Sequence, residues 1–156
     1  MKVKKIVGRL LTAFLLVSVG VAIGKEMAAR NAPAAVGPVA APGETKVIVY
    51  YMHGFPCVTC TFIETTAEKT VRTDFAEAVE AGTMEFVSLN YLEPENAALA
   101  DKYNVGSNMV VAVRFEDGQE VARVRMDEVM ERASNAGRLT DYLRTGIRSV
   151  LEGGGK

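Results

Sequence analysis

The two cysteines of the chain, Cys57 and Cys60, are separated by two residues and are the side chains best suited to covalent chemistry. A β-branched and aromatic run, residues 46–52, precedes them and gives way to Gly54, which is typical of a buried strand followed by a turn. Apolar residues at helical spacing follow over residues 60–81. The amino terminus of a helix favours a thiolate, which is the nucleophile in disulfide exchange. We therefore expect Cys57 to be the nucleophile and Cys60 the resolving thiol.

Three neighbours of this pair have expected supporting roles. Pro56 lacks an N–H group and loses nothing just before a helix begins. Glu64 lies one helical turn beyond Cys60, where its carboxylate can handle protons. His53 is the only histidine of the chain; it either lowers the thiol pKa, binds a metal or fills the end of the strand. Phe55 supplies apolar surface beside the reactive sulfur.

The same residues leave other chemistries open. His53, Cys57 and Cys60 form a nitrogen and sulfur set that suits copper or zinc, with a fourth ligand to come from Glu64, water or a second chain, and Met109 as a soft ligand for copper. A purely structural disulfide is a further alternative, although such a short loop closes little chain entropy. A third is a docking domain without chemistry.

The remaining pattern predicts alternating strands and helices. Strands are expected over residues 46–52, 83–90, 109–115 and 119–125, with a tight hairpin at Asp117 and Gly118. Helices are expected over residues 60–81 with a break near 70–73, and over residues 93–103, 127–134 and 138–152. The order βαβαββα predicts a mixed four-stranded sheet with helices on both faces, the thioredoxin-like layout of an α/β protein.

The first 45 residues differ in composition from the rest. Residues 1–24 combine a basic start with an uncharged apolar run and predict either a cleaved export signal or a single-pass anchor that crosses the membrane over residues 6–23. Residues 25–45 are rich in Ala, Pro and Gly and predict a tether. Residues 46–153 form the expected domain. With the basic end inside, this domain lies on the extracytoplasmic side of a bacterial inner membrane, or in the periplasm after cleavage.

Charge argues against one class of partner. Residues 1–45 contain six basic and two acidic side chains, whereas the rest of the chain contains 12 basic and 17 acidic ones. The expected domain is therefore mildly acidic, which argues against binding of nucleic acid.

The chain resembles the thioredoxin-like family named nitrophenyl compound nitroreductase subunit ArsF, over roughly residues 45–152. The likeness is carried by residues 49–54 leading to Cys57-Val58-Thr59-Cys60, by Ile63-Glu64, and by residues 91–96 and 110–118. It implies a thioredoxin-like fold, export, frequent membrane anchoring and a redox cysteine pair. The family name implies nitroreduction, but nothing in the chain is similar to a flavin or nicotinamide site, and a lone dithiol supplies no hydride. We therefore expect no cofactor beyond the Cys57–Cys60 disulfide.

The chain departs from thioredoxin at three places, one of which is the absence of a proline between Cys57 and Cys60. Asn108 or Met109 is expected where thioredoxin has a cis-proline facing its sulfurs, and Tyr51 stands where thioredoxin has a buried aspartate. The proton-handling carboxylate is thus missing unless Glu64 replaces it.

The sequence favours a membrane-tethered or exported thiol-disulfide oxidoreductase. Its expected partners are proteins with thiols or disulfides and a membrane donor or acceptor of electrons. The alternatives are a metal carrier and a non-catalytic thioredoxin-like subunit of a redox complex. The direction of electron flow is left open, because export compartments hold both oxidising and reducing relays.

Overall fold

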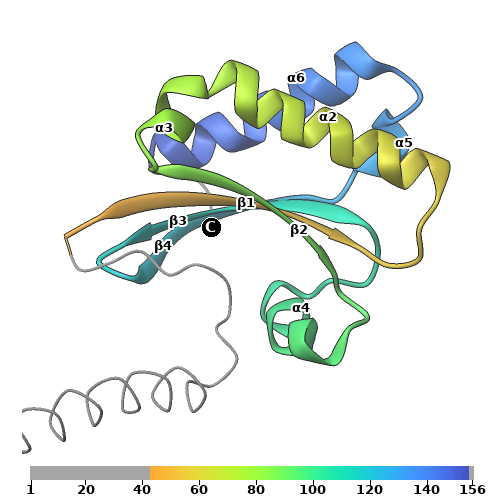
Figure 1. The fold of residues 1–156 in the computed structure, drawn as a ribbon, viewed down its shortest axis with the longest axis horizontal. Helices are drawn as coiled ribbons and strands as arrows, with labels where there is room; N and C mark the ends of the chain where they lie inside the picture. Colours follow the sequence, from red (N-terminus) through yellow and green to blue (C-terminus); the bar gives the residue numbers. More distant parts are fainter. Residues whose placement is uncertain (1–42, 155–156) are drawn as a thin grey trace, which may run out of the picture. The chain divides into compact units, whose positions relative to one another are not determined.

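A computed structural model describes residues 43–154 of the chain. Its core is a four-stranded sheet of order β2-β1-β3-β4, with helices on both faces (Figure 1). The elements in chain order are β1 (Thr45–His53), α2 (Val58–Asp74), α3 (Ala76–Glu80), β2 (Met84–Asn90), the 3-10 turn η1 (Pro94–Asn96), α4 (Ala97–Tyr103), β3 (Met109–Glu116), β4 (Gln119–Met126), α5 (Val129–Arg132) and α6 (Ala136–Leu151).

Strand β1 is central because it is paired on both sides. It runs parallel to β2, with Tyr51 opposite Ser88, and antiparallel to β3, with Tyr51 opposite Val110. The parallel β1–β2 pair is connected through α2, and the antiparallel β3–β4 pair is a hairpin in which Asp117 and Gly118 have positive φ, as a tight Asp-Gly turn requires. This is the thioredoxin-like layout that the periodicity predicts.

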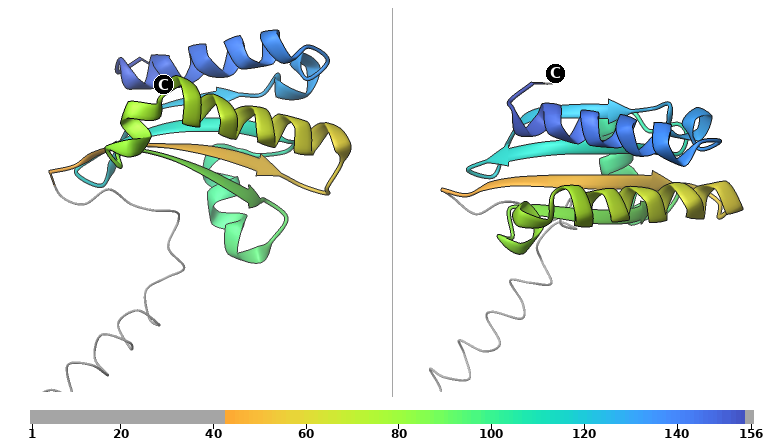
Figure 2. Two further views of the ribbon diagram at one scale, coloured as in Figure 1. Left: turned by 45° about the horizontal axis from the view of Figure 1, so that its top comes forward. Right: turned by 90° about the horizontal axis from the view of Figure 1, so that it is seen from above.

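Helices α2 and α6 lie side by side on one face of the sheet, as the two views in Figure 2 show. Alternate residues of β1 point to this face and bury Val47, Val49 and Tyr51 against the helices. The helices contribute apolar residues at helical spacing, namely Ile63, Ala67 and Val71 from α2 and Leu139, Leu143, Ile147 and Val150 from α6.

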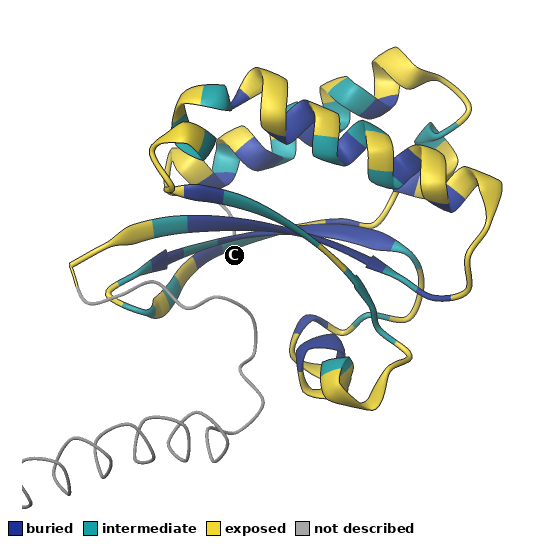
Figure 3. Cartoon of the chain, in the orientation of Figure 1, coloured by how far each residue is buried: buried dark blue, intermediate teal, exposed yellow. Residues whose placement is uncertain are grey.

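The opposite face of the sheet is covered by α4. The other residues of β1, Ile48, Tyr50 and Met52, pack there against Leu99 and Tyr103. Both faces of β1 are therefore buried, which Figure 3 shows as an almost continuous dark strand through the middle of the sheet. Because both faces of β1 are buried, its residues are apolar without alternation, as the run at residues 46–52 shows.

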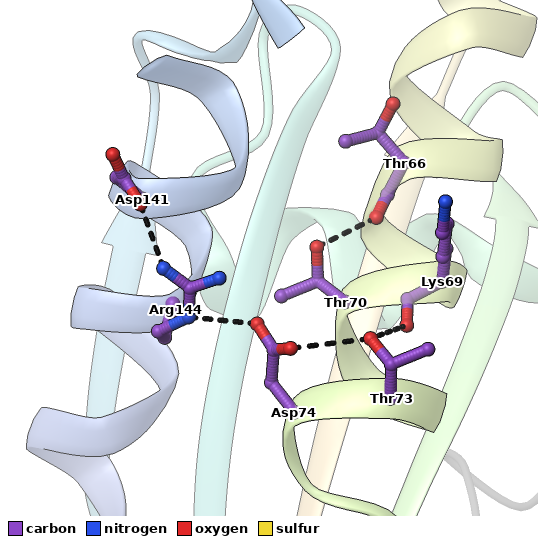
Figure 4. Close-up of polar contacts among 7 residues, drawn as sticks. All are labelled: Thr66, Lys69, Thr70, Thr73, Asp74, Asp141 and Arg144. Carbon is purple, nitrogen blue, oxygen red and sulfur yellow. Dashed lines mark hydrogen bonds and ion pairs between the residues drawn. The ribbon is translucent and has the colours of Figure 1, made fainter. Parts of the chain in front are cut away.

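Helices α2 and α6 are also joined by charge. Arg144 of α6 contacts Asp74 of α2 at 2.7 Å and Asp141 one turn earlier in its own helix (Figure 4). The hydroxyls of Thr66, Thr70 and Thr73 donate to carbonyl oxygens one turn back in α2.

The element boundaries match the prediction within two residues. The break in the long helix lies at Phe75, two residues beyond the predicted stretch 70–73, because the threonine hydroxyls bond back to the helix and leave it intact up to Asp74. The expected helix 60–81 is thus two helices, α2 and α3.

The expected anchor or signal, residues 1–24, lies outside the described residues, as does the tether except for its end. The tether is expected to reach residue 45, but Thr45 already belongs to β1, and the Gly43 N–H donates to the Asp117 carboxylate at 2.6 Å. Within residues 43–154, no helix has the length and apolar character needed to cross a bilayer.

Candidate functional site

The two cysteines lie where three strands meet at one end of the sheet. Strands β1 and β2 end there at His53 and Asn90, which are paired, and β3 begins there at Met109, which pairs with Met52. The chain leaves β1 through Gly54, Phe55 and Pro56 and enters α2 at Val58. The strand–turn–helix placement expected for the pair is therefore present.

Cys57 and Cys60 form a disulfide across the first turn of α2. Cys57 is the N-cap residue, and its sulfur accepts a hydrogen bond of 3.0 Å from the backbone N–H of Cys60. The sulfur thus occupies the position that a serine or aspartate oxygen usually takes at a helix start. When the pair is reduced, this N–H and the helix dipole favour negative charge on Cys57.

The two sulfur-bearing residues differ in exposure. Cys57 is exposed, whereas Cys60 is buried with 6% of its surface accessible. A thiol from another molecule can therefore reach Cys57 and is kept from Cys60. The roles of Cys57 as nucleophile and Cys60 as resolving thiol stay predictions, which this asymmetry supports.

Asn108, the residue just before β3, joins the turn to the buried sulfur. Its side-chain oxygen accepts from the Gly54 N–H at 2.9 Å, and its side-chain nitrogen lies 2.9 Å from the Cys60 sulfur. Of the two residues expected at the cis-proline position, Asn108 is the one that the structure brings to the sulfur. No cis peptide bond occurs within residues 43–154.

Met109, the other residue expected there, packs elsewhere. Its side chain belongs to the core on the α4 face of the sheet together with Met52, whereas Tyr51, which contacts Cys60, faces α2. Successive residues of a strand point to opposite faces, so Asn108 and Met109 cannot both face the disulfide.

Tyr51 joins the central strand β1 to the first turn of α2. Its buried hydroxyl donates a hydrogen bond of 3.0 Å to the Cys60 carbonyl oxygen. Burial, and then the negative charge of Glu64, raise the pKa of Tyr51 from 10.0 to about 12, while Asn108 acts in the opposite direction. Glu64 therefore lies close enough to act electrostatically on this hydroxyl, and it is partly buried, although its expected proton-handling role stays a prediction.

The remaining supporting residues have simpler surroundings. His53 is partly buried; its Nδ1 lies 3.0 Å from the Gly54 carbonyl oxygen, and its ring lies 5.7 Å from the ring of Tyr51. Pro56 is exposed just before the N-cap, as its position in the sequence predicts.

The metal alternative depends on His53, Cys57 and Cys60. In the described part of the chain, no group of three or more His, Cys, Asp or Glu side chains is placed to hold a metal ion. The two sulfurs are bonded to each other here, and metals bind thiolates rather than disulfides.

Exposed apolar side chains occur in and beside the turn that carries Cys57. Phe55 is 82% exposed and Val58 is 90% exposed, and they flank Cys57 in the sequence. Leu92, half exposed, comes close to Gly54 from the β2–η1 loop, since a Cβ atom on Gly54 would lie 3.5 Å from its side chain. Solvent-exposed aromatic and aliphatic groups of this kind suit contact with another protein.

A groove of about 460 Å³ lies apart from the disulfide, between α2 and α6. Phe62, Thr66 and Thr73 on α2 and Thr140 on α6 are among its lining residues, several of which Figure 4 shows. Neither cysteine lines it, and the hydroxyls of Thr66, Thr70 and Thr73 donate to carbonyl oxygens within α2. The groove has no chemical group that links it to the cysteine pair.

Two contacts of the site have only weak signals in the sequence. The bond from the Gly54 N–H to Asn108 and the bond from the Tyr51 hydroxyl to Cys60 form only in the folded chain. Of these two donors, only Tyr51 was indicated by the sequence, through its position six residues before Cys57. Asn108 stood beside Met109 as one of two candidates, and strand alternation decides between them once the register of β3 is known.

Comparison with known proteins gives similarity in structure only. No protein family model matches the chain. No curated protein sequence matches it either. Among solved structures, thioredoxin from Malassezia sympodialis aligns with 18% identity and a TM-score of 0.42 over 70% of this chain and 80% of that one. Thioredoxin from Fasciola hepatica aligns with 24% identity and a TM-score of 0.38 over 67% of this chain and 83% of that one. Thioredoxin from Trypanosoma brucei brucei has 21% identity and a TM-score of 0.38 over 68% and 79%.

Proposed function

We propose that this protein is a thiol-disulfide oxidoreductase that works through Cys57 and Cys60. The observation that carries the proposal is the unequal placement of the two sulfurs: Cys57 is exposed at the N-cap of α2 with a hydrogen bond from the Cys60 N–H, and Cys60 is buried behind it. A disulfide with only a structural role needs neither an exposed sulfur nor a helix N-terminus.

The chemistry proceeds in two exchanges. In the oxidising direction, a substrate thiolate attacks the Cys57 sulfur, the Cys57–Cys60 bond breaks, and the electron pair leaves on the Cys60 sulfur. A second substrate thiolate then attacks the substrate sulfur of this mixed disulfide and releases Cys57 as a thiolate, so the substrate is oxidised and the pair is reduced. In the reducing direction, Cys57 attacks a substrate disulfide and Cys60 resolves the mixed disulfide.

The proposed substrates are proteins. Phe55, Val58 and Leu92 provide an exposed apolar surface around the accessible sulfur, and a polypeptide can cover this surface while one of its sulfurs meets Cys57. Binding energy from that contact holds the reacting sulfurs together, which favours exchange with a protein over exchange with a small thiol.

We further propose that the chain belongs to the thioredoxin-like ArsF family and works outside the cytoplasm. The apolar run in residues 6–23 and the short tether after it support an anchored domain that exchanges electrons with a membrane donor or acceptor. Fusion of a periplasmic reporter to the chain, followed by extraction of the membranes with carbonate, tests both the export and the anchor.

The experiment that tests the enzymatic proposal is the reduction potential of the Cys57–Cys60 pair. The purified full-length protein is equilibrated in glutathione or dithiothreitol buffers and the free thiols are counted by alkylation. A potential between about −270 and −120 mV, the span of known exchange catalysts, supports the proposal and its value indicates the direction of electron flow. A potential below about −300 mV identifies a structural bridge and rejects the enzyme.

A trapping experiment tests the division of labour. Cys60→Ser leaves a mixed disulfide at Cys57 unresolved, so covalent complexes with substrate proteins accumulate. Cys57→Ser removes the exposed nucleophile and accumulates none. Equal trapping by the two variants would contradict the assigned roles.

A further inference from the structure

Asn108 is held in one orientation by the turn that carries the cysteines. Its side-chain oxygen accepts from the Gly54 N–H at 2.9 Å. A primary amide has its acceptor on one atom and its donors on the other, so this bond directs the NH₂ group away from Gly54. The NH₂ group lies 2.9 Å from the Cys60 sulfur.

The two sulfurs therefore each have their own N–H donor. The backbone N–H of Cys60 serves Cys57, and the side chain of Asn108 serves Cys60. The donors matter differently, because Cys57 is exposed to water and Cys60 is not. Burial disfavours a thiolate, so negative charge on Cys60 depends on a donor supplied by the protein.

We propose that Asn108 is a positioning residue that stabilises the negative charge formed on the Cys60 sulfur during disulfide exchange. This inference rests on the proposed function and deepens it. When a thiolate attacks Cys57, the electron pair of the broken bond moves to the Cys60 sulfur, and the Asn108 N–H is already directed at the atom that receives it. A preplaced donor at the position of developing charge costs no reorganisation during the reaction.

The same contact serves the reverse step. Cys60 attacks a mixed disulfide only as a thiolate, and a donor to the charged form lowers the pKa of the thiol. In thioredoxin-like chains with a buried carboxylate, that group handles the proton; here Tyr51 occupies the corresponding strand position and donates to the Cys60 carbonyl instead. Asn108 thus stabilises a thiolate on the buried Cys60 sulfur by donating a hydrogen bond, without accepting a proton.

Other groups around Cys60 act on the same charge. The Phe55 carbonyl oxygen lies 3.7 Å from the Cys60 sulfur and favours the neutral thiol, which can donate to it. Glu64, one turn further along α2, opposes a thiolate by its negative charge. Other titratable groups near this end of the sheet are His53 and Tyr51 on β1 and Tyr91, whose hydroxyl lies close to Gly54. Asn108 is the neutral side chain among them with a donor on the sulfur.

The chain allows a direct test because it contains two cysteines only. In a full-length Cys57→Ala background, Cys60 is the single thiol. Any mixed disulfide is first reduced and the reductant removed. The pKa of Cys60 then follows from the pH dependence of its alkylation rate. We expect Asn108→Leu in this background to raise the pKa of Cys60 by about one unit, the effect of losing a hydrogen bond to a charged group. An unchanged pKa overturns the inference.

Matched variants separate the donor from the fold. In a Cys60→Ala background, Asn108→Leu should leave the pKa of Cys57 unchanged, because Asn108 contacts the other sulfur; an equal rise at both cysteines identifies a general loosening and rejects the inference. Ser107→Ala, at the exposed neighbouring residue, should leave the pKa of Cys60 unchanged.

Asn108→Asp keeps the acceptor for the Gly54 N–H and serves where the leucine variant loses its fold. It removes the donor and adds a negative charge, so the pKa of Cys60 must rise by more than one unit; no rise overturns the inference. In the chain with both cysteines, opening of the disulfide by glutathione should slow about threefold in Asn108→Leu, since a leaving thiol of higher pKa leaves more slowly and the rate depends only fractionally on that pKa.

The outcomes for this inference and for the proposed function are distinguishable. If the unaltered pair fails as an exchange catalyst while the pKa of Cys60 still responds to Asn108, the enzyme is rejected and the sulfur contact stands. If the pair catalyses exchange and the pKa of Cys60 does not respond, the enzyme stands and Asn108 has no part in it.

Discussion

The hydroxyl of Tyr51 donates a hydrogen bond to the carbonyl oxygen of Cys60, and this bond joins the central strand to the first turn of the helix that carries the disulfide. The bond is 3.0 Å long and buried. Through this bond, Tyr51, which lies outside the Cys57–Cys60 motif, holds the backbone of Cys60 in place.

Tyr51→Phe removes the donor and leaves a buried carbonyl oxygen with one partner fewer. We expect it to lower the free energy of unfolding by about 1 to 2 kcal/mol. Urea denaturation of the oxidised protein, followed by circular dichroism, measures this loss. An unchanged midpoint would show that the bond contributes nothing to the fold.

Tyr50→Phe is the matched substitution on the other face of the same strand and should have the opposite outcome. The Tyr50 hydroxyl is fully buried and has no hydrogen-bond partner among the residues that the structure describes. Removing an unpaired buried polar group costs nothing and removes a desolvation penalty. We expect the free energy of unfolding to stay constant or to rise by about 1 kcal/mol in the same urea assay. A loss equal to that of Tyr51→Phe would show that the hydroxyl is paired in solution.

Alkaline pH should destabilise the protein through its buried tyrosines, which include Tyr50, Tyr51 and Tyr103. Burial is the main cause that raises the pKa of Tyr50 and of Tyr51 from 10.0 to about 12. Above pH 10 the unfolded chain loses these protons while the native state keeps them, so stability is complete below pH 10 and is lost as the pH rises toward 12. At about pH 11 each tyrosine should cost about 1 kcal/mol, measured by urea denaturation at a series of pH values.

Two variants assign this pH dependence to the site. Tyr51→Phe lacks one of the titrating groups and should lose stability less steeply with pH. Glu64→Gln removes a negative charge that raises the pKa of Tyr51, so its loss should also be shallower. Curves parallel to that of the unaltered protein would place the alkaline transition elsewhere in the chain.

Phe55→Ser should separate protein substrates from small ones. Phe55 is 82% exposed, so its removal should change the free energy of unfolding by less than about 0.5 kcal/mol. Exchange with a protein disulfide should slow roughly tenfold, the value of one lost apolar anchor at an interface. Exchange with glutathione, which covers little of this surface, should keep its rate. Both rates are measured by quenching samples with acid at timed intervals and counting the free thiols.

Val121→Ser is the control for this substitution. Val121 is a half-exposed apolar residue on the edge strand β4, which does not contribute to the cysteine turn. Its removal should leave both exchange rates unchanged. A similar slowing in the two variants would mean that apolar surface acts generally and that Phe55 has no special place.

The elements of the fold were predictable because their signals are local. The apolar run before the cysteines marks β1, Pro94 marks the turn before α4, and Asp117-Gly118 marks the hairpin. The cysteine pair at a helix start was predictable for the same reason. The break after α2 lies two residues beyond the predicted stretch 70–73, because the threonine hydroxyls there bond within the helix instead of competing with it.

The contacts of the site were harder to predict, since they join residues far apart in the chain. Asn108 meets Cys60 across 48 positions, and the contact depends on the register of β3 against β1. A shift of one residue would direct Met109 to the disulfide instead. The sequence alone could therefore narrow the position to these two residues and go no further.

Strand β1 pairs with neighbours on both edges and packs against helices on both faces, and this has a consequence for the order in which the protein opens. Its amide hydrogens can exchange with deuterium from the solvent only when its pairing with β2 or β3 opens, whereas β2 and β4 lie at the two edges of the described sheet. The turn that carries the cysteines follows directly on this doubly paired strand. Local opening of the edge strands therefore leaves the strand that positions the cysteine pair in place.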